Sequence, residues 1–366
     1  MSTPESAPAA PDAAPDAAPD AAPDATPSGV QRGLSAAKRA VNGPNRPALV
    51  ISLLMSLFAA LFVTSYSLAM GNPQPHDIPV GVISQTVTPE QLEKDLQSLT
   101  GTTFLVSEYP SVAAATQALN EQQIYGAFVS GGAGSTSGEL IISSASGASV
   151  AKLIAADATE LGAKFGVTVT VTDVNPLNPS DPNGLVLFYI ALACTIIGFV
   201  GAIQTRVNAA RLTLGGELAW DVVRAALVAL IVSLTAGPIL GFESFPVLPV
   251  WALLTVAVFV AGSVYSFFRV VIGGKWALMP TWILFILISN PSSGGAVAPQ
   301  LLPPFYEFMG RWLPTGSTVS ALRDLTYFPG YPHPEPYLVL GTWLVLSTVA
   351  FVVARRLKYG TGRIPA

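Results

Sequence analysis

The sequence predicts an α-helical integral membrane protein with about six transmembrane helices and an extracytoplasmic α/β domain inserted between the first and the second. Only 11% of the 366 residues are charged, whereas a soluble domain usually carries about 25%. Hydrophobic residues make up 51% of the chain and gather in long uncharged blocks, which indicates that lipid is their solvent. A polar stretch, residues 71–182, separates the first block from the others.

The N-terminal part is expected to lie outside the folded protein. Residues 1–31 contain a repeated Ala-Ala-Pro-Asp unit, and proline at every fourth position prevents a regular helix. We expect a disordered cytoplasmic tail here, followed by a basic juxtamembrane segment at residues 32–47. The small net charge of -4 gives no indication of nucleic-acid binding.

The first transmembrane helix is predicted at residues 48–70, which carry no charge and can cross a hydrocarbon core of about 30 Å. A helical membrane domain at residues 183–356 supplies about five more spans, followed by a C-terminus at 357–366. These spans are expected at 184–203, 222–240, 250–268, 276–289 and 337–354. The single cysteine, Cys194, is expected to be a small buried residue of the second span.

Lysine and arginine positions predict the orientation of the spans. Basic residues precede the first span and follow the last one. They also flank the loop between the second and third spans and occupy the loop between the fourth and fifth. An even number of spans places all these groups on one side, which the positive-inside rule identifies as the cytoplasm. We therefore expect a multi-pass protein of the plasma membrane with both termini cytoplasmic and with membrane lipids as partners.

The fifth apolar block is too short for an ordinary span. Residues 276–289 reach only about 21 Å as a helix, and turn-forming residues follow over 290–328. We expect a re-entrant or broken element near the outer surface, capped by one or two short interfacial helices; the alternative is an ordinary outer loop with a surface helix. The residues that suggest the break are Asn290, Pro291, Gly294, Gly295, Pro303 and Pro304.

The polar stretch is expected to fold as alternating strands and helices. Short apolar runs predict strands, and a capping-box spacing from Thr88 to Gln91 predicts the start of a helix. The expected strands are 78–84, 104–107, 124–129, 139–144 and 167–174, and the expected helices are 88–99, 111–122 and 149–165. Together they describe a small α/β domain tethered to the membrane at both ends.

No pattern in the sequence indicates an enzyme. His76 and His333 lie far apart in loops, and no metal-ligand spacing, catalytic triad or phosphate-binding GxxxxGK[ST] loop is present. We therefore assign no catalytic, cofactor-binding or metal-binding residues and no cofactor. Asp221 and Arg224 are expected at the cytoplasmic start of the third span, as an interfacial ion pair or a partner contact. No buried acid is expected in the bundle, which disfavours an ion-coupled carrier.

The order of parts resembles ABC-2 type transporter permeases, and particularly the phage-infection-protein group. Three stretches carry the resemblance, which covers about residues 47–356: the first strand, residues 115–129 (ATQALNEQQIYGAFV), and the segment from Asn290 to Gly295 (NPSSGG) through Leu302-Pro303-Pro304-Phe305 to Arg323 and Asp324. The resemblance implies a homodimeric permease subunit that exports a hydrophobic or amphiphilic substrate.

The resemblance also implies a separate ATPase bound at cytoplasmic residues. The candidate contacts are Lys38, Arg39, Arg206, Arg211, Asp221 and Arg224, although basic residues before the first span also suit anchoring to anionic lipid. A second hypothesis from another class is a non-transport envelope protein. It would be a secretion or cell-wall assembly accessory factor, or a surface receptor, whose outer domain binds a partner.

Overall fold

The computed structural model describes residues 29–30, 33, 46–71, 73–84, 87–130, 136–242 and 245–363. Residues 1–59 and 60–366 form two compact units, and the contacts below lie within the second. Among the described residues, five helices are long and apolar enough to cross a membrane, and the apolar helix at Gly274–Ser289 is shorter. The long helices are α2 (Arg46–Tyr66, extended by η1, Ser67–Gly71), α7 (Val186–Asn208), α8 (Leu214–Leu234, extended by η2, Thr235–Ile239), α9 (Val247–Ile272) and α13 (Pro334–Tyr359).

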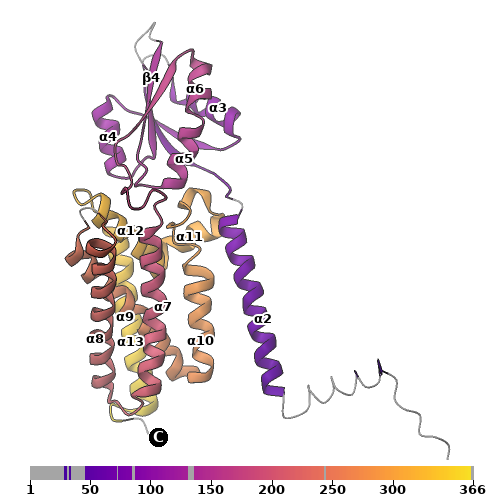
Figure 1. Cartoon of the computed structure of the whole chain (residues 1–366), viewed down its shortest axis with the longest axis vertical. Helices are drawn as coiled ribbons and strands as arrows, with labels where there is room; N and C mark the ends of the chain where they lie inside the picture. Colours follow the sequence, from indigo (N-terminus) through magenta and orange to yellow (C-terminus); the bar gives the residue numbers. More distant parts are fainter. Residues whose placement is uncertain are drawn as a thin grey trace, which may run out of the picture. The chain divides into compact units, whose positions relative to one another are not determined.

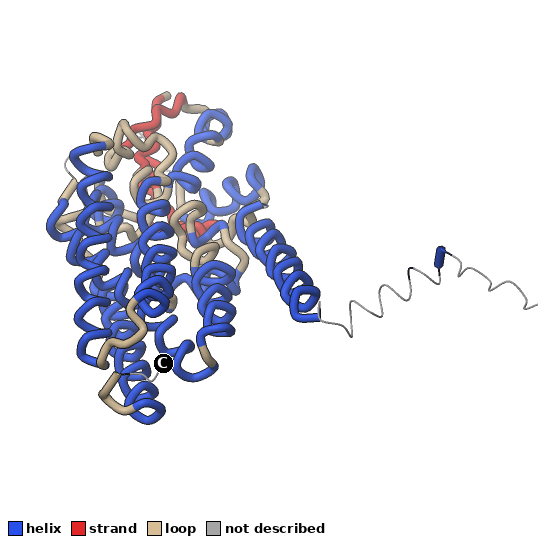
Figure 2. The backbone as a smooth tube through the Cα atoms, turned by 60° about the horizontal axis from the view of Figure 1, so that its bottom comes forward, coloured by secondary structure: helices blue, strands red, loops and turns tan. Residues whose placement is uncertain are grey.

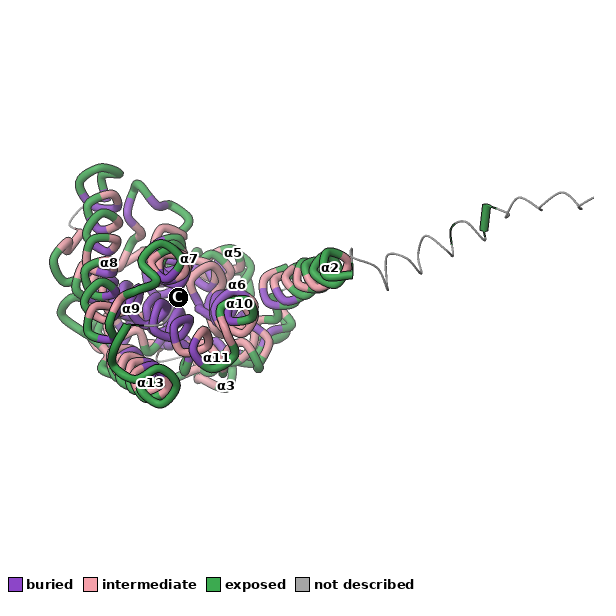
Figure 3. The backbone as a smooth tube through the Cα atoms, turned by 90° about the horizontal axis from the view of Figure 1, so that it is seen from below, coloured by how far each residue is buried: buried purple, intermediate pink, exposed green. Residues whose placement is uncertain are grey.

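Helix α9 forms the centre of the helical bundle. It packs against α7, α8, α13 and α10 (Gly274–Trp282), and most of its length is buried, whereas α8 and α13 keep exposed outer faces (Figure 3). A Cβ atom on Gly198 of α7 would lie 2.7 Å from the carbonyl oxygen of Val258 in α9. Glycine at this crossing therefore lets the two backbones approach each other closely.

The α/β domain contains one mixed sheet of five strands, seen above the bundle helices in Figure 1. The strand order is β2-β1-β3-β4-β5, and only the β3–β4 pair is antiparallel. The strands are β1 (Ile78–Ile83), β2 (Phe104–Glu108), β3 (Gly126–Ser130), β4 (Ser137–Ile142) and β5 (Thr168–Asp173). The domain helices are α3 (Pro89–Thr100), α4 (Val112–Asn120), α5 (Ala148–Ala156) and α6 (Ala158–Phe165).

Helices cover both faces of this sheet because alternate strand residues point to opposite sides. One face packs Val80, Val82 and Phe128 against α3, α5 and α6, and the other packs Ala127 and Ile141 against α4. Two residues far along the chain, Ala298 and Leu301, also belong to the first of these cores. The buried core of the α/β domain is therefore completed from outside residues 71–182.

The segment between the short helix and α13 contains two further helices. After η3 (Ile283–Ser289) the chain is irregular to the short turn η4 (Pro299–Leu301), then forms α11 (Pro304–Trp312) and α12 (Pro314–Tyr327). Figure 2 shows that helices make up most of the chain and that the strands gather in one region. One or two short interfacial helices are predicted here, and the structure has two helices, α11 and α12. Helix α11 buries none of its residues, whereas α12 is buried over much of its length.

Most predicted elements of the α/β domain are confirmed, but one of its helices is divided, and in the bundle one helix begins earlier than predicted. The helix expected at 149–165 is broken at Asp157, because α5 packs against β4 and α6 packs against β5. The third apolar helix begins at Leu214 rather than near 222, because the Thr213 hydroxyl accepts a hydrogen bond from the Gly216 N–H and caps the helix there. Asp221 and Arg224 are therefore about two to three turns inside α8.

Candidate functional site

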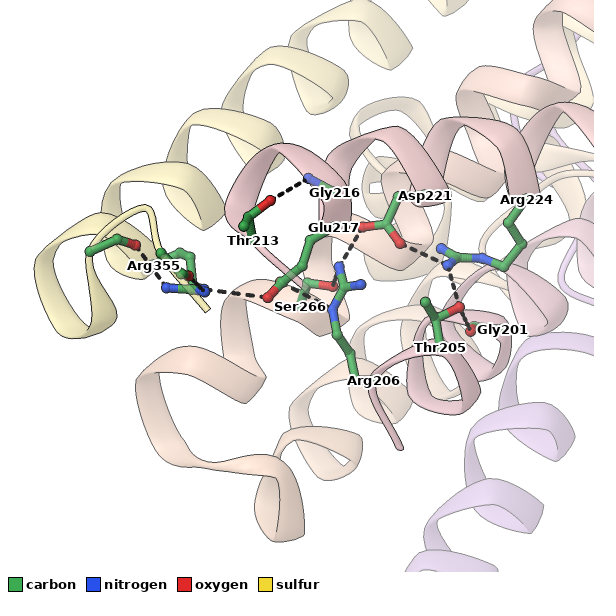
Figure 4. Close-up of polar contacts among 12 residues, drawn as sticks. Gly201, Thr205, Arg206, Thr213, Gly216, Glu217, Asp221, Arg224, Ser266 and Arg355 are labelled. Carbon is green, nitrogen blue, oxygen red and sulfur yellow. Dashed lines mark hydrogen bonds and ion pairs between the residues drawn. The ribbon is translucent and has the colours of Figure 1, made fainter. Parts of the chain in front are cut away.

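A network of ion pairs joins three helices at one end of the bundle (Figure 4). Arg206 of α7 lies 2.6 Å from the Asp221 carboxylate through Nη2, and 3.2 Å from the Glu217 carboxylate through Nε. Arg224 Nη1 lies 2.7 Å from the other Asp221 oxygen, and Arg355 Nε of α13 lies 3.4 Å from Glu217. Glu217, Asp221 and Arg224 occupy one face of α8 because they are four and three residues apart.

The network is buried almost completely. Glu217 and Asp221 are 1% and 0% exposed, and Arg206 and Arg355 are 6% and 0% exposed. A charge without a partner is costly in such a place, so each carboxylate pairs with two guanidinium groups. Three arginines face two carboxylates, which leaves the network with an excess of positive charge.

Two glycines make room for Arg224 between the helices. A Cβ atom on Gly262 of α9 would lie 2.7 Å from Arg224 Nη2, and one on Gly201 of α7 would lie 2.7 Å from Arg224 Cδ. The arginine also donates from Nη1 to the Thr205 hydroxyl, 3.0 Å away. Its side chain therefore fills a notch between α7 and α9 while its charge pairs with Asp221.

Arg355 ties the end of α13 to the start of α8. Its Nη1 and Nη2 atoms donate to the carbonyl oxygens of Gly360 and Gly362, each 2.7 Å away. The Leu214 N–H donates to the Thr361 carbonyl, and Lys358 Nζ donates to the Val270 carbonyl of α9. The ends of α7, α8, α9 and α13 are thus cross-linked by polar contacts, and a shift of one helix end must move the others or break an ion pair.

The structure brings together three of the six residues predicted as partner contacts. Arg206, Asp221 and Arg224 lie in the network, whereas Arg211 is exposed in the turn between α7 and α8. Lys38 and Arg39 lie outside the described residues. The ion pair expected between Asp221 and Arg224 is confirmed.

One expectation about this region is wrong: acidic side chains are buried in the bundle, because arginines from neighbouring helices neutralise them. The sequence predicts Asp221 and Arg224 at the start of the third span, and the helix that contains them begins earlier, at Leu214. Sequence reasoning also missed Glu217 and Arg355 as network members. Glu217 could have been found because it lies four residues before Asp221, on the same face of the helix. Arg355 could not, because it is 138 residues away from Glu217 in the sequence.

At the other end of the bundle, Asp324 joins the bundle to the α/β domain. This α12 carboxylate is 2% exposed and accepts hydrogen bonds from Gln122 Nε2 at 2.8 Å and from the His333 backbone N–H at 3.0 Å. The His333 ring lies between the Asp324 carboxylate and the Glu121 carbonyl. Gln122 has a left-handed backbone, with φ 52°, which a residue other than glycine adopts at a cost.

A short segment at residues 296–302, which we call the strap, attaches the chain between η3 and α11 to the α/β domain. The Tyr125 hydroxyl donates to Gln300 Oε1 at 2.6 Å, and the Ala298 N–H donates to the Ser149 hydroxyl. The N–H of Gln74 donates to the Leu301 carbonyl. Burial raises the pKa of Tyr125 to about 12, so its hydroxyl stays protonated and remains a donor at neutral pH.

The residues predicted to form the broken element separate into two groups. Asn290, Pro291 and Gly294 are buried and Gly295 is half-buried; Asn290 donates to the Tyr66 hydroxyl, and the Gly294 carbonyl accepts from Arg323 Nη2. Gly294 has φ 69°, a value that favours glycine. Pro303 and Pro304 instead lie at the start of α11, where proline is well tolerated.

Within the described ranges, no cluster of three or more His, Cys, Asp or Glu side chains could hold a metal ion. Cys194 is buried in α7.

Comparison of the chain with known protein families, curated proteins and solved structures finds no match.

Proposed function

We propose that this chain is the membrane-spanning permease subunit of an ABC-2 type exporter, which moves a hydrophobic or amphiphilic substrate with energy from a separate ATPase. The observation that carries the proposal is a bundle of apolar helices with polar connections at both ends. Buried ion pairs join the helices at one end, and at the other end Asp324 and the strap connect the bundle to the α/β domain. A permease driven by a separate ATPase needs such a connection, because the motor acts at one membrane face and the substrate leaves at the other.

The proposed topology has six crossings: the five long helices and the shorter Gly274–Ser289 helix. Lys358 contacts the carbonyl of Val270 and Arg355 contacts Glu217, so the ends of α9 and α13 and the start of α8 meet. These ends carry many of the basic residues, which supports placing them and both termini in the cytoplasm of a plasma-membrane protein. The α/β domain then lies outside the cell. A homodimer is proposed from the family resemblance alone.

The burial of the network refines the proposed ATPase contact. The side chains of Arg206 and Asp221 are 3% and 1% exposed, so they have almost no surface to offer a partner. Arg211, exposed in the adjacent turn, is the better candidate for direct contact. The buried ion pairs would instead hold this turn in place and transmit its movement to α13.

The test is to purify the tagged full-length chain in mild detergent and to identify any ATPase that accompanies it. We expect an ATPase with the wild type and its loss with Arg211→Glu, because the substitution reverses the charge of the proposed contact. Lys94→Glu, a charge reversal at another exposed residue, on α3, is the matched control and should retain the ATPase. Absence of an ATPase from the wild-type preparation, together with unchanged efflux of drugs and lipids after gene deletion, would refute the exporter.

The same experiment bears on the second hypothesis, a non-transport envelope protein. Strands β2 and β5 are the two edges of the sheet, and each has an exposed apolar side chain, Leu105 and Val171 respectively. An edge strand can pair with a strand of a partner protein. Recovery of an envelope protein that depends on these edges, without any ATPase, would favour this accessory or receptor role.

A further inference from the structure

An apolar furrow follows α13 from Tyr337 to Val349, partly on its exposed side and partly along its contacts with α9 and α8. Its first part has a volume of about 490 Å³ and is lined by Tyr337, Gly341 and Val345 among others. Gly341 also lines a second part of about 410 Å³ between α13 and α9. Leu344 and Val256 continue from there into a third part of about 470 Å³ that reaches Val349. The lining of α13 from Tyr337 to Val349 is about 18 Å long, long enough for a hydrocarbon chain.

A polar pocket lies directly at one end of this furrow. It has a volume of about 150 Å³, and its lining includes Pro336, the residue before Tyr337 of the furrow. The polar side chains around it come from three helices: Arg311 of α11, Ser317 and Ser320 of α12, and Glu335 of α13. Pro336 and Tyr337 are neighbours in the first turn of α13, so the polar pocket borders the start of the apolar furrow.

The polar pocket holds opposite charges that are not neutralised by each other. The Arg311 side chain is 62% exposed and contacts only Glu307, at 3.1 Å, by one of its nitrogens, so most of its five N–H donors remain available. The Glu335 carboxylate has no hydrogen bond or ion pair to any described residue. The Ser317 hydroxyl, in a residue only 3% exposed, also lacks a partner within the part of the chain that the structure describes.

These groups match a zwitterion rather than a simple anion or cation. A guanidinium group and hydroxyls are suited to phosphate oxygens, whereas a carboxylate is suited to an ammonium group that can donate hydrogen bonds. A second copy of the chain would cover the apolar furrow, but it would leave the buried Ser317 hydroxyl without a partner. The occupant that fits both ends is an amphiphile with a phosphate and a primary ammonium in its head.

We propose that this site binds a zwitterionic aminophospholipid, with its phosphate at Arg311, its ammonium at Glu335 and one hydrocarbon chain in the α13 furrow. The inference deepens the proposed function by naming a substrate class, and it rests on the proposed orientation for its position in the outer leaflet. The lipid is held at the side of the bundle, where it can enter from the bilayer without crossing water.

The test measures binding of acyl-labelled lipids to the purified full-length chain in detergent, with phosphatidylethanolamine, phosphatidylcholine and phosphatidylglycerol as separate probes. We expect phosphatidylethanolamine to bind about tenfold more tightly than phosphatidylcholine, whose quaternary ammonium cannot donate to Glu335. Free phosphoethanolamine should compete only at much higher concentration, because it lacks the chain that fills the furrow. Similar binding of all three lipids, as for an ordinary lipid shell, would overturn the proposal.

Three variants separate the parts of the site. Glu335→Gln should remove the preference for phosphatidylethanolamine over phosphatidylcholine, and Arg311→Gln should weaken both about tenfold. Gly341→Leu should fill the furrow and weaken every probe; a Cβ atom there meets no other atom within 4 Å, so the fold should be retained. Lys94→Gln, which removes an exposed charge on α3, is the control and should leave binding unchanged.

The remaining outcomes also decide the question. If Gly341→Leu leaves lipid binding unchanged, the furrow is not the chain site and the proposal fails. If the same variant converts a dimer to a monomer while lipid preference stays the same, the furrow is a subunit interface and the proposal also fails. The binding assay needs no ATPase, so its result is independent of whether an ATPase accompanies the chain.

Discussion

At the scale of single residues, Asp221 is the side chain on which the buried network depends most. It lies between Arg206 and Arg224, and both of its oxygens accept short charged hydrogen bonds. Its removal would leave two guanidinium groups in a buried place with fewer negative partners. Burial of an uncompensated charge is among the most destabilising changes a protein can undergo.

We therefore expect Asp221→Asn to lower the free energy of unfolding by about 3–5 kcal/mol, measured by denaturant titration in detergent. Arg211→Gln, whose side chain is exposed, should change it by less than about 0.5 kcal/mol. The double variant Asp221→Asn with Arg224→Gln should recover part of the loss, because it removes one of the unpaired cations. Equal stability of Asp221→Asn and the wild type would show that the network contributes nothing to folding.

Part of this network could be predicted from the sequence and part could not. The Asp221–Arg224 pair follows from a three-residue spacing on one helix. The contacts of Arg355 with Glu217 do not, since they depend on how α13 packs beside α8, which no local pattern encodes. The notch around Arg224 could not be predicted either. Glycine in a membrane helix predicts close packing, but it does not show which side chain lies against it.

At the scale of secondary-structure elements, the strap and the segment before β1 hold α11 against the α/β domain. His76, just before β1, contacts the Gln74 carbonyl through Nδ1 at 2.8 Å and Glu307 of α11 through Nε2 at 3.2 Å. Both partners are acceptors, so the imidazolium form satisfies both contacts. The hydrogen bond to Gln74 is the largest influence that raises the pKa of His76, and Glu307 and Asp77 add to it, while burial opposes it.

This raised pKa predicts a pH-dependent contribution of His76 to stability. A group whose pKa is higher in the folded state stabilises it fully below the ordinary value of 6.5, and this contribution disappears as the pH rises through the folded value. We expect wild type to exceed His76→Gln in stability by about 1 kcal/mol or less at about pH 5.5, and the two to be equal at about pH 8.5. Thermal unfolding of both proteins across this range measures the difference. A gap that is the same at every pH would exclude protonation of His76 as its cause.

The elements were predicted with different success for physical reasons. All five strands were predicted, because short apolar runs bounded by turn residues are typical of strands and because residues 167–174 alternate between apolar and polar. The third span was predicted only from residue 222, whereas α8 begins at Leu214 and includes the polar residues Glu217 and Asp221. Their charges are tolerated there only because arginines of α7 and α13 reach them, information that is absent from the local sequence.

At the scale of the whole molecule, the proposed topology makes a direct prediction about access from each side of the membrane. The natural cysteine is buried, so a single introduced cysteine can report its own location. Glu160 on α6 and Arg363 near the chain end are both exposed, and the proposed topology puts them on opposite sides. Glu160→Cys should react with a membrane-impermeant maleimide on intact cells, whereas Arg363→Cys should react only after permeabilisation. Reaction of both variants, or of neither, on intact cells would contradict six crossings with a cytoplasmic C-terminus.

The contribution of the strap to the α/β domain has a consequence for how this protein can be divided and recombined. Residues 71–182 look like an independent module in the sequence, yet Ala298 and Leu301 occupy its buried core. A fragment cut at these boundaries would expose an unfilled apolar surface to water and would be expected to aggregate. A chimaera that exchanges this domain with that of another protein must therefore transplant residues 296–302 together with it, as one discontinuous graft.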